Sequence, residues 1–196
     1  MSFWLPRGHH LSLHIERRPL HDAGRFTGGG WKLVWHTTQG SGAEGAFSTV
    51  RAERSAPHFI IDHSGRVIQT VALNRAACAL EHNSGPETNL AHAIQVECVG
   101  HEAQSGRWSN GYYTHLADLF VLINHRLNLR IPNVSRHSFH GPRLGGREFV
   151  RAQGHLGHLH VPGNNHTDPG KEFRVHHLIG EIRVRGIVFL LKNIFK

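Results

Sequence analysis

Cysteine is scarce in this sequence: Cys78 and Cys98 are the two present, and they form no CxxC pair. So low a number excludes a small fold held together by disulfides. Both residues have apolar neighbours, in the segments AACAL and VECVG. We therefore expect two buried free thiols, which fits a protein of a reducing compartment.

Long apolar segments are also missing. No run approaches the ~20 residues that a transmembrane helix requires, so no such helix is predicted. The first residues, MSFWLPRGHHLSLH, contain no continuous apolar stretch and no cleavage site of small residues. We expect no secretory signal peptide.

Acidic residues are outnumbered: 14 Asp and Glu stand against 22 Lys and Arg, which gives a formal net charge of +8 and a pI of about 10.5. Such a charge favours a polyanionic partner: nucleic acid, an anionic membrane surface, or a bacterial wall rich in phosphate and carboxylate. No nucleic-acid-binding motif is present, so no specific nucleic acid is expected. The 20 histidines would raise the charge steeply on mild acidification, because free imidazole titrates near pH ~6.5.

The composition indicates one globular core, with 39% hydrophobic and 18% charged residues in a chain of 196. The patterns predict strands at 31–36 and 93–99, a hairpin over 57–71 that turns at 63–65, helices at 43–54, 113–127 and 171–183, and a short helical turn at 73–80. Strands interleaved with helices indicate the α/β class, with a single mixed central β-sheet flanked by helices.

Both ends of the chain differ in composition from the middle. Residues 1–30 are rich in Arg, His and Gly, and we interpret them as an irregular N-terminal arm. Residues 184–196, VRGIVFLLKNIFK, combine basic and apolar residues. This tail is either an amphipathic helix at a membrane interface or an element packed on the core, and the second interpretation is preferred.

The segment AIQVECV, residues 93–99, alternates between two faces of a strand. Ile94, Val96 and Cys98 share one face, and Glu97 lies on the other. Glu97 is therefore expected to project from the middle of a strand, away from its most apolar face. The alternative is a surface glutamate in an ion pair.

A second distinctive segment is GHLHVPGNNHTDPG, residues 157–170, with three histidines, one aspartate, two prolines and three glycines. Its prolines and glycines predict a shaped loop rather than a long helix or a central strand. Imidazole and carboxylate are ligands that zinc favours, and a catalytic zinc site uses three protein ligands. His36, at the end of a strand, is one candidate. Composition alone does not choose the others from the set His155, His158, His160, His166 and Asp168.

Four segments in this order, WHTTQG, HFIIDHSGRVIQTV, TNLAHAIQVECVG and GHLHVPGNNHTDPG, resemble those of zinc-dependent N-acetylmuramoyl-L-alanine amidases. That family shares its fold with the peptidoglycan recognition proteins. The motifs are most similar to those of endolysins from phages of actinobacteria. The resemblance covers about residues 31–180, and the last motif is its longest and most specific part.

The resemblance implies a set of zinc ligands. The family's first histidine falls on His36, its second on His158, and its aspartate on Asp168, ten residues after His158. His155 and His160 are then left outside the ligand set, as a solvated and a loop-packing histidine respectively. His160 could also orient a ligand.

The resemblance also assigns catalytic and binding roles. Glu97 matches the acidic residue that acts as general base in many members. His166 stands where well-studied members have a lysine that stabilises the oxyanion, so this role would pass to a histidine with a different pH dependence. His82 and Asn89 loosely match residues that line the groove for sugar or stem peptide, although a plain surface loop is an equal alternative.

Taken together, the resemblance implies Zn²⁺-dependent hydrolysis of the amide between N-acetylmuramic acid and L-alanine in peptidoglycan, by a catalytic domain at 31–183. The alternative is a non-catalytic peptidoglycan-binding module of the same fold, which loss of a ligand would favour, and none is lost. A phage endolysin would be made in the host cytoplasm and act on the wall after release, or be carried in the virion. The basic charge would favour peripheral contact with an anionic wall or membrane, and we expect a monomer.

Overall fold

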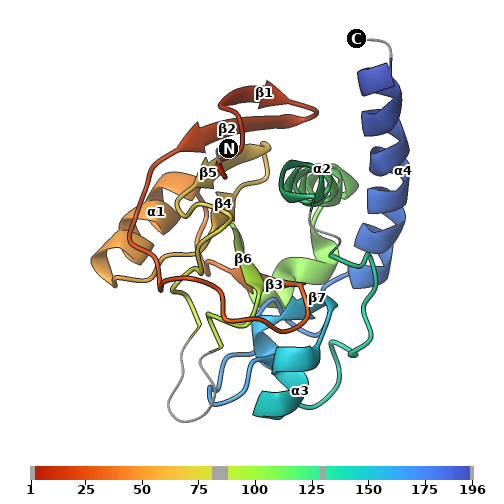
Figure 1. Ribbon diagram of the computed structural model, residues 1–196. Coiled ribbons are helices and arrows are strands. Elements are labelled where there is room, and N and C mark those ends of the chain that lie inside the picture. Colours follow the sequence, from red (N-terminus) through yellow and green to blue (C-terminus); the bar gives the residue numbers. More distant parts are fainter. Residues whose placement is uncertain (1–2, 81–87, 129–130, 195–196) are drawn as a thin grey trace.

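Seven strands form one mixed β-sheet in the computed structural model, which describes residues 3–80, 88–128 and 131–194 (Figure 1). The strands are β1 (Gly8–His10), β2 (Leu13–Arg17), β3 (Lys32–Thr37), β4 (Phe59–Ile61), β5 (Arg66–Gln69), β6 (Ala93–Cys98) and β7 (Gly154–Gly157). Their order in the sheet is β1-β2-β5-β4-β6-β3-β7. The β1–β2 and β4–β5 pairs are antiparallel, and the other neighbours are parallel.

The parallel strands β6, β3 and β7 determine where the site can form. In register, His36 of β3 lies opposite Glu97 of β6, and Trp35 lies opposite Gly157, the last residue of β7. The carboxyl ends of all three strands therefore meet at one edge of the sheet. Every residue of β3 is buried, as is usual for a central parallel strand covered on both faces.

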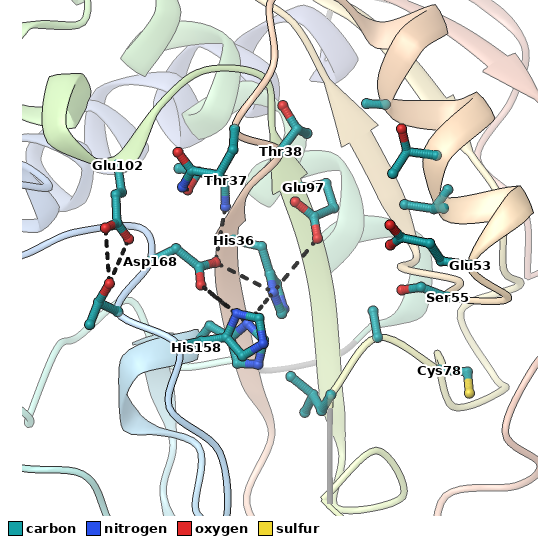
Figure 2. A pocket seen from close by; sticks show the side chains of 18 of the residues that line it. His36, Thr37, Thr38, Glu53, Ser55, Cys78, Glu97, Glu102, His158 and Asp168 are labelled. Carbon is teal, nitrogen blue, oxygen red and sulfur yellow. Dashed lines mark hydrogen bonds and ion pairs between the residues drawn. The ribbon is translucent and has the colours of Figure 1, made fainter.

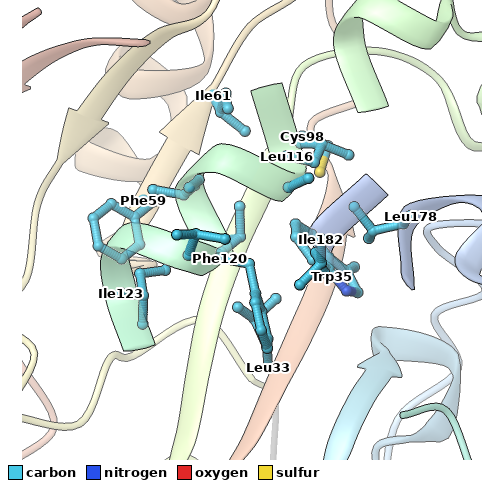
Figure 3. Close-up of a cluster of buried hydrophobic side chains, with 14 of the residues drawn as sticks. Leu33, Trp35, Phe59, Ile61, Cys98, Leu116, Phe120, Ile123, Leu178 and Ile182 are labelled. Atoms are coloured by element: carbon cyan, nitrogen blue, oxygen red, sulfur yellow. The ribbon is translucent and has the colours of Figure 1, made fainter. Parts of the chain in front are cut away.

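Helices cover both faces of the sheet. The helices are α1 (Ala43–Ala52), α2 (Asn110–Leu127), α3 (Gly146–Arg151) and α4 (Val175–Ile194), with short 3-10 turns η1 (Glu102–Arg107) and η2 (His158–His160). On one face, Leu33 and Trp35 pack with Leu116 and Phe120 of α2, and α4 lies against α2 (Figure 3). On the other face, Ile60 packs in a cluster with Val50 of α1, and Val34 packs in a cluster with Phe149 of α3.

Helix α2 shows how local sequence gives local structure. Leu116, Leu119, Phe120 and Ile123 recur at helical spacing and are all buried. Ser109 caps the amino end, since its side chain accepts a hydrogen bond from the backbone N–H of Tyr112. The residue after the helix, Asn128, caps its carboxyl end; it has a φ of 48° and so adopts the left-handed conformation common at helix ends.

A buried aspartate of α2 joins the first and the last elements of the fold. Asp118 is fully buried and accepts hydrogen bonds from Arg185 of α4, at 2.5 Å from Nε and 2.8 Å from Nη2. It also accepts from Ser12, at 2.6 Å from the hydroxyl and 3.1 Å from the backbone nitrogen. Because Ser12 lies between β1 and β2, one carboxylate holds the N-terminal hairpin and α4 to α2.

Lys32 is a buried cation inside β3. Its ammonium donates hydrogen bonds to the carbonyl oxygens of Gly30, at 2.6 Å, and Ala91, at 2.5 Å. It also lies 5.1 Å from the ring centroid of Phe149. Burial lowers the pKa of Lys32 to about 7, because removal from water disfavours the charged form.

Most predicted elements are confirmed, including the strands at 31–36 and 93–99, the hairpin over 57–71 and the helices at 43–54 and 113–127. The expectation of an irregular arm over 1–30 is wrong for residues 8–17, which contribute β1 and β2, and is confirmed for residues 18–30, which form no helix or strand beyond a single bridge at Gly24. The parallel pairing of β2 with β5 buries Leu13 and Ile15. Their polar neighbours, His14 and Glu16, alternate with them.

Two further predictions, a helical turn at 73–80 and a separate tail at 184–196, are also wrong. Residues 73–80 form no helical turn; Ala76 and Cys78 instead pair with Gly24 and Ala56 in isolated bridges. Long-range backbone bonds thus override the local pattern. The last helix extends to Ile194, so residues 184–194 continue α4 and are not a separate tail. The preferred interpretation, an element packed on the core, is confirmed for the side of the helix that carries Arg185 and Phe189.

No helix within the described ranges is long and apolar enough to cross a membrane. The cysteines differ from each other, since Cys98 is buried and Cys78 only half-buried. The prediction of two buried thiols therefore holds for Cys98 and is wrong for Cys78.

Candidate active site

Three side chains from distant parts of the sequence meet at the carboxyl edge of the central strands. His36 lies near the end of β3, His158 follows β7 directly, and Asp168 comes from the loop beyond η2 (Figure 2). All three are buried, and one potential ligand atom from each lies within 4.8 Å of the other two. The group can therefore hold a metal ion.

The distances between these atoms are close to those expected between ligands of one metal ion. The two Nδ1 atoms of His36 and His158 are 3.1 Å apart. Oxygen atoms of Asp168 lie 3.3 Å from Nδ1 of His158 and 3.7 Å from Nδ1 of His36. Atoms bound at about 2.0–2.1 Å to a tetrahedral zinc ion are about 3.3–3.4 Å apart. Two imidazoles and a carboxylate are also a ligand set that zinc favours.

The protonation states suit metal ligands, which must be a neutral imidazole and an ionised carboxylate. Burial lowers the pKa of His36 to about 3, which keeps the ring neutral. Burial acts to raise the pKa of Asp168, but hydrogen bonds from His158 and His166 outweigh it and hold the pKa well below its usual range. The carboxylate also accepts a hydrogen bond from the backbone N–H of Thr37, at 3.1 Å.

The far nitrogen of each ring is not engaged in the same way. The Nε2 atoms of His36 and His158 are buried and have no hydrogen-bond partner among the described residues. Among the described residues, the polar contacts of each ring are therefore made by its Nδ1 atom, with the other ring and with Asp168. The Nδ1 side of each ring is the one that faces a shared ligand.

Glu97 faces the same space from the neighbouring strand. Its Oε1 atom lies 3.7 Å from Nδ1 of His36, and its side chain is 13% exposed. Its Oε2 atom has no partner among the described residues. Burial, with smaller contributions from Asp168 and Glu53, raises the pKa of Glu97 to about 8. A carboxyl group with a raised pKa and an uncommitted oxygen can exchange a proton with a bound molecule.

His166 lies at the rim of the site. Its ring stacks on that of His158, with centroids 4.1 Å apart and planes 10° from parallel. Its Nδ1 atom lies 3.6 Å from Asp168, and 44% of its side chain is exposed. The ring thus touches both a candidate ligand and solvent.

The site opens into a groove of about 820 Å³. Its walls come from the end of α1, the segment 78–80, Glu102 and the loop around 165–168. Figure 2 shows Glu53, Ser55 and Cys78 on the wall opposite the three clustered residues. The cluster and Glu97 therefore line one open groove.

The two residues predicted to bind substrate have different outcomes. His82 lies outside the described residues. Asn89 is buried, where its oxygen accepts from the backbone N–H groups of Ala79 and Leu80, at 3.2 and 3.0 Å, and from the side-chain amide of Gln95, at 2.9 Å. It holds the backbone of the groove wall and is not among the groove-lining residues. Its contact with substrate stays a prediction.

His155 and His160 are placed away from the candidate ligand cluster. The expectation that His155 is solvated is wrong: it is fully buried, accepts from Nε1 of Trp35 at 3.2 Å, and bonds Asn133 through Nε2 at 3.0 Å. Burial lowers its pKa to about 3. His160 accepts from the backbone N–H of Gly157, at 2.9 Å, and packs inside the loop, as predicted.

Arg143 is a residue that the sequence did not single out. Its guanidinium donates to the backbone oxygens of Val161 and His166 and to the side-chain oxygen of Asn164, all at 2.8 Å. These contacts hold the loop that carries His158 and His166. An isolated arginine in a loop gives no local signal of such a role.

Comparison with known proteins agrees with this geometry. The family model described as N-acetylmuramoyl-L-alanine amidase matches residues 31–171, more than half of the chain. A search of curated proteins finds no match.

Several solved structures are similar to this one in fold. The Staphylococcus aureus hydrolase AmiA, solved with its ligand, aligns with a TM-score of 0.61 at 16% identity, over 90% of this chain and 88% of its own. The amidase LysC from Clostridium intestinale gives a TM-score of 0.55 at 13% identity, over 86% and 97%. A mutant of PlyL gives 0.59 at 15% identity, over 87% and 99%.

Proposed function

Because the chain belongs to the N-acetylmuramoyl-L-alanine amidase family, we propose that it hydrolyses peptidoglycan as a zinc enzyme and serves as a phage endolysin. The bond cut is the amide between N-acetylmuramic acid and L-alanine. The observation that carries the proposal is the convergence of His36, His158 and Asp168 at distances typical of zinc ligands.

In this proposal, His36, His158 and Asp168 hold the metal. Zinc held there would supply a Lewis acid for the scissile carbonyl and for a water molecule. The neutral state of His36 and the ionised state of Asp168 support this assignment, since both are the forms that bind a cation. Arg143 keeps the loop with His158 in place.

Glu97 is the proposed general base. It takes a proton from the attacking water and returns it to the nitrogen of L-alanine as the carbon–nitrogen bond breaks. Its position opposite His36, and its Oε2 atom, which has no partner in the described part of the chain, support this role. A nearby dication would lower the raised pKa of Glu97 and favour the ionised form that a base requires.

His166 is the proposed donor to the carbonyl oxygen as negative charge develops there. Support comes from its place at the rim, stacked on His158 and partly exposed to the groove. The donor would be an imidazole N–H, so this contribution would depend on the protonation of the ring.

The endolysin role is supported by resemblance and by charge. The motifs resemble those of phage endolysins, and one similar structure is described as an endolysin amidase from Clostridium intestinale, with a TM-score of 0.53. The net charge of +8 favours an anionic wall. In this role the protein is made in the host cytoplasm and acts on the wall after release.

The test is mass spectrometry of soluble products from purified peptidoglycan, with and without a chelator and added zinc. Peptides with a free L-alanine amine, lost on chelation and restored by zinc, are expected. Tight binding to the wall without released peptides would overturn the proposal and favour a non-catalytic recognition module. Release that persists in chelator would reject zinc while leaving the amidase reaction intact.

A further inference from the structure

The C-terminal half of α4 presents apolar side chains to solvent. Val184, Ile187, Leu190 and Leu191 have exposed fractions of 58%, 61%, 61% and 50%. Among the described residues, Phe3 is the one other large hydrophobic side chain that is exposed. Exposed apolar side chains concentrated in this way mark an interaction surface more often than scattered ones do.

These four side chains form one stripe. Val184, Ile187 and Leu191 follow the i, i+3, i+7 spacing of a single helix face, and Leu190 is adjacent to them. The opposite side of α4 packs on α2: Ile182 is buried, Arg185 pairs with Asp118, and the Phe189 ring lies 4.6 Å from that of His125. The helix is therefore fixed on one side, and the apolar stripe faces outward.

The charged side chains beside the stripe are mostly basic. Arg183 and Lys192 on α4 and Arg126 near the end of α2 are exposed, and Glu181, one turn before Val184, is the one acidic residue of α4. Within the described part of the chain, none of the three forms an ion pair with an acidic side chain. The sequence from 182 to 196 contains no Asp or Glu. An apolar stripe with basic residues beside it suits an anionic surface.

We propose that this face of α4 docks on the surface of an anionic lipid bilayer. The helix would lie in the plane of the interface, with the apolar stripe among the lipid headgroups and the basic residues against their phosphates. A second copy of the chain fits less well, because two such faces would bring their basic residues together.

The position of the face allows docking without disturbing the fold. In Figure 1 the carboxyl end of α4 lies at the edge of the molecule, at the opposite end from α3. The side chains needed for packing on α2 are separate from those of the stripe. The helix can thus meet a surface as it stands.

The test is co-sedimentation with vesicles made of equal parts phosphatidylglycerol and phosphatidylcholine, compared with vesicles of phosphatidylcholine alone. The unmodified chain should bind the anionic vesicles and not the neutral ones. The double variant Ile187→Glu with Leu191→Glu should bind about tenfold more weakly or worse, since it places two charged side chains where apolar ones would contact the lipid. The milder Ile187→Ser with Leu191→Ser pair should also weaken binding, and it keeps the test valid if the charged pair misfolds.

The matched control is Arg147→Glu, an exposed position of α3. Like the pair Ile187→Glu with Leu191→Glu, it lowers the net charge by two units. Its binding to the anionic vesicles should stay within about twofold of that of the unmodified chain if the face of α4 is the docking site. Both double variants should hydrolyse purified peptidoglycan at the unmodified rate. Absence of binding by the unmodified chain, or equal loss in Arg147→Glu, would overturn the proposal. So would a dimer, detected by light scattering, that the double variants abolish.

Discussion

His36 and Glu97 are direct neighbours across two parallel strands. The register of β3 with β6 places them opposite each other, and Oε1 of Glu97 lies 3.7 Å from Nδ1 of His36. A candidate metal ligand and a candidate base are therefore positioned by the same ladder of backbone hydrogen bonds. Their separation is set by rigid strands rather than by loops.

The first prediction concerns Glu97. Glu97→Gln keeps the size of the side chain but removes its ability to accept a proton. We expect turnover to fall by roughly 10²–10⁴-fold, the usual contribution of a general base. Bound zinc, measured by elemental analysis of the purified variant, should stay at the unmodified level. An unchanged rate of peptide release would remove Glu97 from the role of base.

The second prediction concerns the ligands. His36→Ala, His158→Ala and Asp168→Ala should each abolish hydrolysis and lower the zinc content, because each removes one of three protein ligands. Elemental analysis and product release together provide the measurement. His155→Gln, a buried histidine outside the cluster, is the control for loss of a histidine alone, and it should retain zinc. Full activity in any of the three variants would exclude that residue from the ligand set.

The third prediction concerns Arg143. Arg143→Met removes the hydrogen bonds to Val161, Asn164 and His166, so the loop that carries His158 should lose its fixed position. Zinc affinity, measured by competition with a chelator, should fall by about 10–100-fold, as for other groups that support ligands.

Arg147→Met is the matched control for Arg143→Met, because Arg147 is an exposed arginine only four residues away. It should leave zinc affinity unchanged. Arg143→Lys should restore part of the affinity, since an ammonium can reach some of the same acceptors. Equal zinc affinities in Arg143→Met and the unmodified chain would show that the loop holds without this residue.

The fourth prediction is a pH dependence of stability caused by Lys32. Its pKa is about 7 in the folded chain, whereas an unfolded chain restores the ordinary value of about 10.4. Between these values the unfolded state binds one more proton, so the free energy of unfolding should rise with pH, by up to about 1.4 kcal/mol per pH unit. Below pH 7 both states are protonated and the dependence ends.

Urea unfolding of metal-free protein at several pH values measures this effect. Lys32→Met keeps an unbranched side chain that is one atom shorter and removes the titrating group. The difference between the unmodified chain and Lys32→Met should therefore rise from about pH 7 towards pH 10. A difference independent of pH would mean that the carbonyls of Gly30 and Ala91 keep the ammonium charged.

Local sequence patterns predicted the elements whose apolar residues follow one period. The alternation of Ile94, Val96 and Cys98 gave β6 and the side on which Glu97 lies, and the helical spacing of Leu116 to Ile123 gave α2. The N-terminal hairpin and the segment 73–80 were missed, because their backbone bonds go to partners distant in the sequence.

The candidate site, too, combines features that the sequence predicts with features that depend on distant contacts. His36 is 122 residues from His158, and the residues alone left five late candidates to complete the ligand set. The resemblance selected among them, and the selected three are those that the fold brings together. The contacts of Arg143 and Asn89 depend on the folded loop and wall, so no spacing in the sequence could predict them.

Asp118 makes the two ends of the molecule depend on each other. The hairpin turn and the last helix share one buried carboxylate, so neither behaves as a detachable appendage. Removal of Arg185 would leave the buried carboxylate without its counter-charge, and removal of Ser12 would leave it without two hydrogen bonds. Deleting the N-terminal hairpin should therefore increase the rate of local opening of α4, which lies on the far side of α2. We therefore expect the N-terminal hairpin and α4 to open as one cooperative unit.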